Sequence, residues 1–211
     1  MLSQSHKVYA LVLCALWFLP AVAQRADQQP ATRQSRSLGK PGVIKVGQNE
    51  VAIPDVEVQD QYGRKVHLYS DLFKGRVVVV SFFFTRCTLV CPLQGEALAK
   101  LRTVLGKKLG REVFFISISK DPKNDTPQQL KMWSKRYGVV AGWTLVTGTE
   151  AVMSHVLWEL IGEQPGPQLH NAVLFVGNDQ TGIWETAPGL SSPGKLLDVI
   201  ERVSRGSRAR L

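Results

Sequence analysis

Cysteine is scarce in this sequence: 211 residues include three cysteines, namely Cys14, Cys87 and Cys91. A chain of this length can bury an ordinary hydrophobic core and does not depend on disulfide bonds for its stability. The scarcity therefore excludes a small scaffold held together by disulfides. Cys87 and Cys91 are nevertheless separated by only three residues, at the end of an apolar run, so this pair needs an explanation of its own.

The N-terminus lacks an apolar run long enough to be a clear membrane span. Uncharged residues after Lys7 extend only to Gln24, which is short for a span of about 20 apolar residues. The stretch ends in an Ala-Val-Ala sequence at Ala23, a pattern typical of export signals. We therefore predict a signal peptide at residues 1–23, cleaved together with Cys14, and an exported, periplasmic protein. A retained leader would instead anchor the protein to a membrane.

Acidic residues are too few to balance the basic ones, and the net charge is +9. The excess lies mainly near the ends of the chain, because residues 24–40 and the tail from Ser204 each carry +3. Basic tails favour solubility or a loose attraction to anionic surfaces. Since the segment between them holds little of the excess, we predict no nucleic-acid partner and at most peripheral membrane association.

The chain divides into segments of different composition. Residues 24–42 are rich in Gln, Arg, Ser, Ala and Pro without apolar periodicity, which predicts a disordered linker. A folded domain is predicted over residues 43–203, followed by a basic tail at residues 204–211. Apolar periodicity and turn residues predict the elements of the domain: a hairpin at 56–69, strands at 76–84, 112–119 and 143–148, a strand pair at 170–186, and helices at 93–110, from 127, at 149–162 and at 192–203.

Strands that alternate with helices in this way indicate an α/β fold with a central sheet flanked by helices and an N-terminal β-hairpin. The last two strands are joined by a tight turn, which makes the sheet mixed rather than fully parallel. The strand at 76–84 is a continuous apolar run, as expected of a strand buried on both faces. Cys87 and Cys91 follow it directly, at the position where such a sheet presents reactive groups.

The cysteine pair is compatible with more than one chemistry. If a helix begins near Thr88 or Leu89, both thiols lie in its first turn, where free N–H groups and the helix dipole lower thiol pKa values. Positions four residues apart on a helix have Cα atoms about 6 Å apart, so that Cys87 and Cys91 could cycle between dithiol and disulfide. The two thiolates could equally hold a soft metal ion such as copper(I) or zinc. A purely structural disulfide would close a very small loop and stabilise the fold little.

A metal site would need a third ligand, and the histidines outside the predicted leader are the candidates. His67 falls on the wet face of the predicted hairpin, and His155 lies beside Ser154 on the surface of a predicted helix. His170 begins a predicted strand directly after a loop rich in Gly and Pro. A residue in that position can face the end of a neighbouring strand, so His170 is the best candidate of the three, although a simple loop histidine fits equally well.

Several segments, in their order along the chain, resemble the Sco/SenC family of exported, thioredoxin-like copper proteins. The family pattern is a strand ending in T-x-C-x-x-x-C-P, a D-P-x-x-D-T loop before a helix, a T-G-T segment and a late histidine. The matching segments are FFFTRCTLVCP, ISISKDPKNDTP, LVTGT and HNAVLFVGNDQTG, within a match over roughly residues 47–203. The resemblance implies a thioredoxin-like fold.

The resemblance also implies a copper site formed by Cys87, Cys91 and His170. The two thiolates would hold copper(I), the imidazole would help to accommodate copper(II), and Asp121 could lie just outside the ligands or simply organise a turn. Such proteins are implicated in delivering copper to, or reducing the cysteines of, the dinuclear copper centre of cytochrome c oxidase. The implied partner is the copper-site subunit of that oxidase, beside other periplasmic thiol proteins.

Two positions depart from the family pattern. Thr88 stands where the family usually has Pro, and Leu169 stands where an acidic residue often precedes the histidine. Without that acid, a candidate for orienting the imidazole through its other nitrogen is absent. Thr88 also creates a Thr-x-x-Cys spacing that resembles the peroxidatic loop of peroxiredoxins, in which Cys91 would be the nucleophile. A thiol–disulfide oxidoreductase with Cys87 as the attacking thiol, and a peroxidase, are therefore the alternatives.

Overall fold

The computed structural model describes residues 39–46, 49–166 and 172–206, all within one compact unit of the chain. These residues form nine strands and four α-helices, together with a π-helix, η1, and a short 3-10 turn, η2. In chain order the elements are β1 (Gly39–Val46), β2 (Asn49–Asp55), β3 (Glu57–Asp60), β4 (Lys65–His67), η1 (Leu68–Phe73), β5 (Val77–Phe83), α1 (Val90–Leu105), η2 (Gly106–Lys108), β6 (Val113–Ser119), α2 (Pro127–Arg136), β7 (Trp143–Thr147), α3 (Glu150–Ile161), β8 (Val173–Asn178), β9 (Ile183–Pro188) and α4 (Pro193–Ser204).

The described strands form one mixed sheet in the order β2-β1-β9-β8-β5-β6-β7-β3-β4. β5, β6 and β7 run parallel to one another, whereas β8 pairs antiparallel with β5. The predicted hairpin is present as β3 and β4, and β3 also pairs antiparallel with β7. The predicted α/β fold with a mixed central sheet is therefore confirmed.

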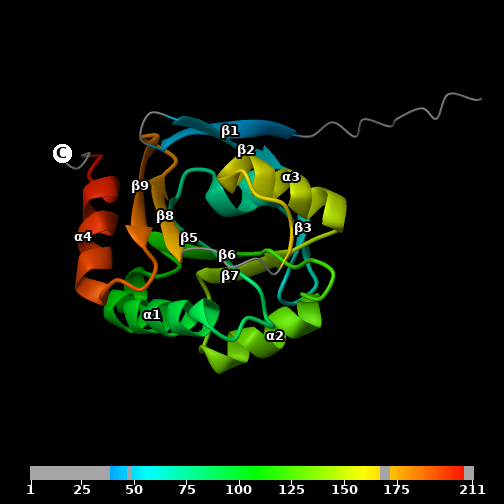
Figure 1. Ribbon diagram of the computed structural model, residues 1–211. Coiled ribbons are helices and arrows are strands. Elements are labelled where there is room, and N and C mark those ends of the chain that lie inside the picture. Colours follow the sequence, from blue (N-terminus) through cyan, green and yellow to red (C-terminus); the bar gives the residue numbers. More distant parts are fainter. Residues whose placement is uncertain (1–38, 47–48, 167–171, 207–211) are drawn as a thin grey trace, which may run out of the picture. The chain divides into compact units, whose positions relative to one another are not determined.

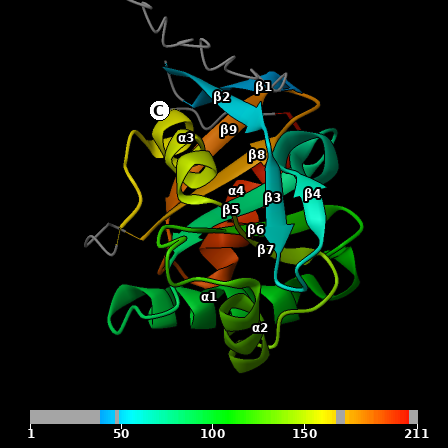
Figure 2. The same ribbon diagram turned by 90° about the vertical axis from the view of Figure 1, so that its right-hand side faces the viewer.

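Helices cover both faces of this sheet, which is why its central strands consist of β-branched and aromatic residues. α1, α2 and α4 lie on one face, and α3 and η1 lie on the other (Figure 1, Figure 2). Each interface has its own set of buried side chains. The α1 cluster includes Phe83, Leu101 and Trp133, and the α3 cluster includes Phe82 and Leu157; the two sets share no member.

The helix ends partly follow the sequence signals. Thr126 accepts a hydrogen bond from the Gln129 backbone N–H at 3.3 Å, and Pro127 takes the first position of α2, as predicted. α1 begins at Val90 rather than at Thr88 or Leu89, because Leu89 has φ −111° and ψ −86° and supplies no capping side chain. It ends at Leu105 instead of Gly110.

A strand pair that the sequence did not predict, β1 and β2, extends the sheet beyond β9. β1 begins at Gly39, inside the range expected to be a linker, and it pairs with β9 only at Lys45 and Val46. The predicted signal peptide at residues 1–23 lies outside the described residues. Among the residues that are described, no helix is both long enough and apolar enough to span a bilayer.

Candidate metal and redox site

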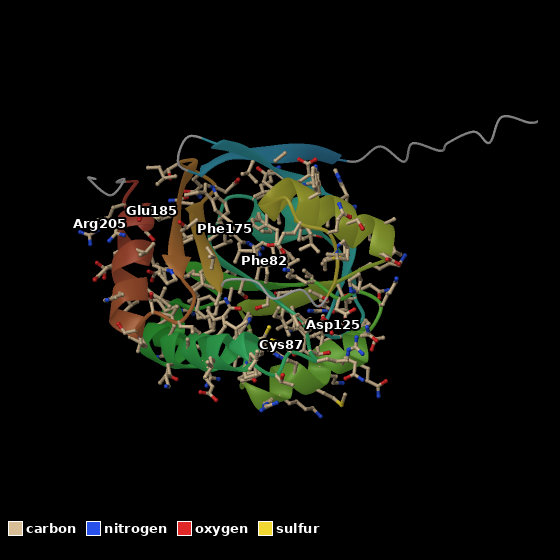
Figure 3. All side chains as sticks on the ribbon, viewed as in Figure 1. Phe82, Cys87, Asp125, Phe175, Glu185 and Arg205 are labelled. Carbon is tan, nitrogen blue, oxygen red and sulfur yellow. The ribbon has the colours of Figure 1, made fainter. Side chains whose placement is uncertain are left out.

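The two cysteines lie in the connection from β5 to α1 and in the first turn of α1. Cys87 is in the connecting loop and is half-buried, whereas Cys91 is in the first turn of α1 and is only 1% exposed. Figure 3 shows Cys87 close to the N-terminal end of α1. Both cysteines carry free thiols. The structure therefore brings the predicted pair together at one edge of the sheet, with one sulfur accessible and the other enclosed.

The sulfur of Cys87 accepts hydrogen bonds from the start of the helix. The backbone N–H of Cys91 donates to Cys87 Sγ at an N–S distance of 3.3 Å. Partial burial acts to raise the pKa of Cys87, but hydrogen bonds from the Cys91 thiol and from the backbone N–H groups of Cys91, Leu89 and Val90 outweigh it, and the pKa falls below its ordinary value. The predicted lowering is confirmed for this cysteine.

The thiol of Cys91 behaves in the opposite way. Burial, with the hydrogen bond to Cys87 and the nearby charges of Cys87 and Asp125, raises its pKa to about 12, although a hydrogen bond with the Phe84 backbone acts in the other direction. The expectation of a lowered pKa was wrong for Cys91, because the helix N-terminus does not compensate for the loss of water around the sulfur. The site thus contains one thiol that ionises readily and one that keeps its proton.

A buried carboxylate holds the loop that carries Cys87. Asp125 is 0% exposed and accepts hydrogen bonds from the Thr85 backbone N–H at 2.9 Å, from Thr85 Oγ1 at 2.5 Å and from Ser119 Oγ at 2.6 Å. Burial raises the pKa of Asp125, and the negative charge of Asp121 raises it further. The hydrogen bonds from Ser119 and Thr85 act to lower it, but the net shift is upward. The contacts join the end of β5, the end of β6 and the residue before the cap of α2. Sequence reasoning missed Asp125, although it belongs to the D-P-x-x-D-T segment.

Asp121 lies beside the same loop, at a different contact. Its carboxylate accepts hydrogen bonds from Arg86 Nη2 at 3.0 Å and from the Asn124 side-chain amide at 2.8 and 2.9 Å. Arg86 directly precedes Cys87, and its side chain is 60% exposed. The carboxylate of Asp121 therefore holds the Arg86 side chain in place and stabilises the turn from Asp121 to Asn124.

His170, the predicted third ligand, and Leu169 lie outside the described residues. The chain on either side of residues 167–171 is tied to the edge of the sheet that carries the cysteines. The Gly166 backbone N–H donates to the Lys120 carbonyl at 2.6 Å, and the Lys120 N–H donates in turn to the carbonyl of Phe83 at 2.7 Å. On the other side, the Gly189 N–H donates to the Ala172 carbonyl at 2.5 Å.

Gln94 is a second residue near the site that sequence reasoning missed. It is 2% exposed on α1, one turn beyond Cys91, and its amide nitrogen has no hydrogen-bond partner among the described residues. A Cβ placed on Gly189 would lie 2.6 Å from that nitrogen and 2.8 Å from the Ala172 carbonyl oxygen. The residue that follows β9 therefore packs closely against α1, near the cysteines. A glutamine in an apolar helical stripe is the only signal that the sequence offered.

The donor set that the described residues provide consists of two sulfurs. No group of three or more His, Cys, Asp or Glu side chains within the described ranges could hold a metal ion. His67 lies 3.8 Å from Asp71 and His155 lies 4.0 Å from Glu159, each through Nδ1, and their side chains are 59% and 39% exposed, as predicted of surface histidines. Two adjacent sulfurs suit a soft ion such as copper(I).

A comparison with protein families identifies the matching model. The model described as SCO1/SenC matches residues 47–204, which is most of the chain. A curated relative, the SCO1 protein homolog of Bacillus subtilis (strain 168), is 39% identical over 91 residues, covering 43% of this chain and 46% of the relative. The chain aligns with 46% to 61% of the length of the curated relatives that it matches.

Solved structures with the same fold include two Sco proteins. BsSco, described as a member of the Sco family of cytochrome c oxidase assembly proteins with a disulfide switch, gives a TM-score of 0.62 at 22% identity and covers 79% of this chain and 96% of its own. Bradyrhizobium japonicum ScoI, solved with copper bound, gives a TM-score of 0.58 at 20% identity over 78% of this chain and 99% of its own. These likenesses confirm the thioredoxin-like fold.

Proposed function

Because the chain belongs to the SCO1/SenC family, we propose that it is an exported copper-binding protein that serves the assembly of cytochrome c oxidase. Its partner would be the copper-site subunit of that oxidase, to which it delivers copper or whose cysteines it reduces. The relatives support this role, since BsSco is described as an oxidase assembly protein and ScoI from Bradyrhizobium japonicum holds copper. The signal at residues 1–23 would direct the protein to the periplasm, and a retained leader would leave it anchored to the membrane.

The copper ligands in this proposal are Cys87, Cys91 and His170. The observation that carries it is the cysteine pair itself, with an accessible low-pKa sulfur and a second sulfur held beside it by the first turn of α1. Binding of copper(I) would ionise both thiols, so the loss of the Cys91 proton must be driven by the metal. His170 would supply a nitrogen donor, which suits copper(II) better than sulfur alone does.

Copper titration tests the ligand set. The reduced protein should bind a single copper(I) ion and, after addition of copper(II), show thiolate-to-copper absorption and a copper spin-resonance signal. Cys87→Ser and Cys91→Ser should abolish both signals, and His170→Ala should change the copper(II) spectrum. His155→Ala is the matched control, because His155 lies on α3 and should leave every spectrum unchanged. An unaltered copper(II) spectrum in His170→Ala would remove that residue from the site.

Thiol–disulfide exchange is a second candidate function, favoured by the different ionisation of the two thiols. The Cys87 thiolate would attack a disulfide of a partner protein, form a mixed disulfide and release one partner thiolate, which takes up a proton. Cys91 would then lose its proton and attack the Cys87 sulfur. The second partner thiol would leave with a proton, and Cys87 and Cys91 would remain as a disulfide. Two electrons thus pass from the cysteine pair to the partner.

The trapped intermediate tests this exchange. Cys91→Ser should accumulate a mixed disulfide with a disulfide-containing oxidase fragment, whereas Cys87→Ser should accumulate none. Mass spectrometry without reducing agent detects the product. If neither variant is trapped while copper binding is intact, delivery of copper is the remaining role.

The structure argues against a peroxidase. That alternative requires Cys91 as the nucleophile, but this residue is 1% exposed and its pKa is about 12. A thiol with such a pKa is almost fully protonated at neutral pH, and the thiol is a poor nucleophile. Thr88, the residue that suggested this chemistry, is exposed in the loop.

A further inference from the structure

Basic side chains gather along two neighbouring helices beside the thiol site. Two adjoining grooves, of about 470 and 520 Å³, are lined from α2 and the β3–β4 turn and from α1 and α2 respectively, and they share Lys135. Together we call them the α1–α2 basic groove, which is defined by five cationic residues of its lining: Lys100, Arg102, Lys131, Lys135 and Arg136. Figure 1 shows α1 and α2 on the same face of the sheet.

These five cations have no carboxylate partner among the described residues, although ion pairs are common elsewhere in the molecule. Arg64, Arg202 and Lys120 each pair with an acid, whereas no ion pair involves the groove cations. The described lining of the two grooves contains a single acid, Glu96. The positive potential of the groove is therefore not neutralised from within the described part of the domain, and it favours an anionic occupant.

The groove is not purely polar. Tyr62, at the β3–β4 turn, is 58% exposed, and Met132 on α2 is 51% exposed, and both line it with Pro127. Exposed aromatic and Met side chains next to cations are typical of surfaces that bind polypeptides. Each part of the groove has room for a few side chains. The chemistry therefore fits an extended polypeptide that alternates acidic with apolar residues better than it fits a nucleic-acid duplex or a flat membrane.

The groove lies close to the thiol site without reaching it: Glu96, its first lining residue on α1, follows Cys91 by five residues. A Cβ at Gly95 would lie 2.9 Å from the ring of Tyr137, so the end of α2 packs on α1 one turn beyond Cys91. Tyr137 also lines the groove. Lys100 follows Cys91 by nine residues on the same helix, which corresponds to about 13 Å. An extended chain covers that distance with about four residues, so a segment in the groove could continue to the Cys87 sulfur.

We propose that the α1–α2 basic groove is a docking site for an acidic, partly apolar segment of a partner protein. The segment would lie along α1 and α2 and would bring the partner's own metal- or thiol-bearing residues towards Cys87. Docking depends on the cations and on the exposed apolar side chains of the groove. It requires neither copper nor the thiols, and it can therefore hold or fail independently of the proposed copper function.

Fluorescence anisotropy with a defined peptide tests the groove. The probe is a fluorescein-labelled peptide in which Glu alternates with Leu, and the reference is the same peptide with Gln in place of Glu. The full-length copper-free protein should bind the Glu peptide saturably at low ionic strength and more weakly as salt is added. The Gln peptide should not bind. Cys87→Ser should bind as the wild type does, which separates docking from copper chemistry.

Charge reversal locates the binding. Lys131 and Lys135 lie one turn apart on the exposed side of α2, and the double variant Lys131→Glu with Lys135→Glu should weaken binding at least about tenfold, because each change removes an attraction and adds a repulsion. The matched control is Lys107→Glu with Lys108→Glu, an equal change of charge on exposed residues of η2 outside the groove, and it should have little effect. The milder Lys131→Gln with Lys135→Gln provides a second series, and circular dichroism verifies folding.

Three outcomes would overturn the proposal. The first is an absence of peptide binding at low salt. The second is an equal loss in the groove variant and the η2 variant, which would indicate unspecific attraction to net charge. The third is tighter, groove-dependent binding of oligothymidylate or of phosphatidylglycerol vesicles, which would assign the surface to nucleic acid or to membrane. A selective loss in the groove variants with the Glu peptide would support it.

Discussion

The Cys87 sulfur and the Cys91 sulfur differ in their surroundings although they lie within one turn of each other. Backbone N–H groups at the start of α1 point at Cys87, and apolar side chains of the α1 cluster enclose Cys91. Of these two cysteines, we expect Cys87 and not Cys91 to react with iodoacetamide at neutral pH, because the pKa of Cys91 is about 12.

Removal of the Cys91 thiol should change the ionisation of Cys87. Cys91→Ala deletes a hydrogen-bond donor to the Cys87 thiolate, so the pKa of Cys87 should rise and the midpoint of its alkylation rate should move to higher pH. Cys91→Ser keeps a donor at the same position and should stay closer to the wild type. The measurement is the alkylation rate against pH. Identical profiles for the alanine and serine variants would show that the thiol donor has no role.

Asp125→Asn should make stability depend on pH in a different way. Burial raises the pKa of Asp125 in the folded state, so its carboxyl group stabilises the fold most below the unfolded pKa of 3.8, and this contribution declines as the pH rises through the folded pKa. The variant lacks this contribution. Its deficit in unfolding free energy should be largest at acid pH and should shrink towards neutral pH. Urea unfolding over a pH series measures it, with the exposed Asp198→Asn on α4 as control.

The residues of the site differ in how visible they are in the sequence. The cysteine spacing was enough to predict the pair, and the family pattern was enough to propose His170. Asp125 and Gln94 were not found, because their importance comes from burial and from contacts with Thr85, Ser119 and Gly189 that only the folded chain creates. The opposite pKa shifts of the two thiols have the same origin.

The packing of the end of α2 against α1 requires a glycine, Gly95, at the point of contact. A Cβ on Gly95 would lie 2.9 Å from the buried ring of Tyr137, so Gly95→Ala should lower the unfolding free energy by about 1–3 kcal/mol despite the better helix propensity of Ala. Gly194, in the first turn of α4, has no atom within 4 Å of its Cβ position, and Gly194→Ala should be neutral or stabilising by up to about 1 kcal/mol. Chemical denaturation compares the two, and a stabilised Gly95→Ala would contradict the packing.

The sequence predicted most of the strands and helices, because long apolar runs and a clear cap leave little choice. β5 and β6 are continuous apolar stretches, and α2 begins at Thr126–Pro127. β1 and β2 were not predicted, because they owe their form mainly to pairing with each other, and β1 joins the rest of the sheet at only two residues of β9. The start of α1 was placed too early, because the Cys87 loop is held by Asp125 outside the helix.

At the scale of the whole molecule, a partly buried ion pair joins the end of β6 to the segment that follows α3. Lys120, at the end of β6, is 0% exposed, and its amine pairs with Glu163, which follows α3 and is 37% exposed. Glu163→Gln leaves a buried charge without its partner and should cost about 1–2 kcal/mol, less than a fully buried pair because water still reaches Glu163. Adding Lys120→Met should restore most of the loss. Thermal unfolding of both single variants and the double variant gives the coupling, and additive losses would mean that the pair is not coupled.

Two separate hydrophobic interiors lie on opposite sides of the sheet, and Cys91 belongs to only one of them. Substitutions in the α3 cluster can therefore alter the thermal stability of the protein without disturbing the packing around Cys91. Substitutions of Phe83 or Trp133 would affect both stability and the thiol site, because these two rings pack together in the same cluster as Cys91. Thermal stability and thiol reactivity can consequently be changed separately, by substitutions on opposite faces of the same sheet.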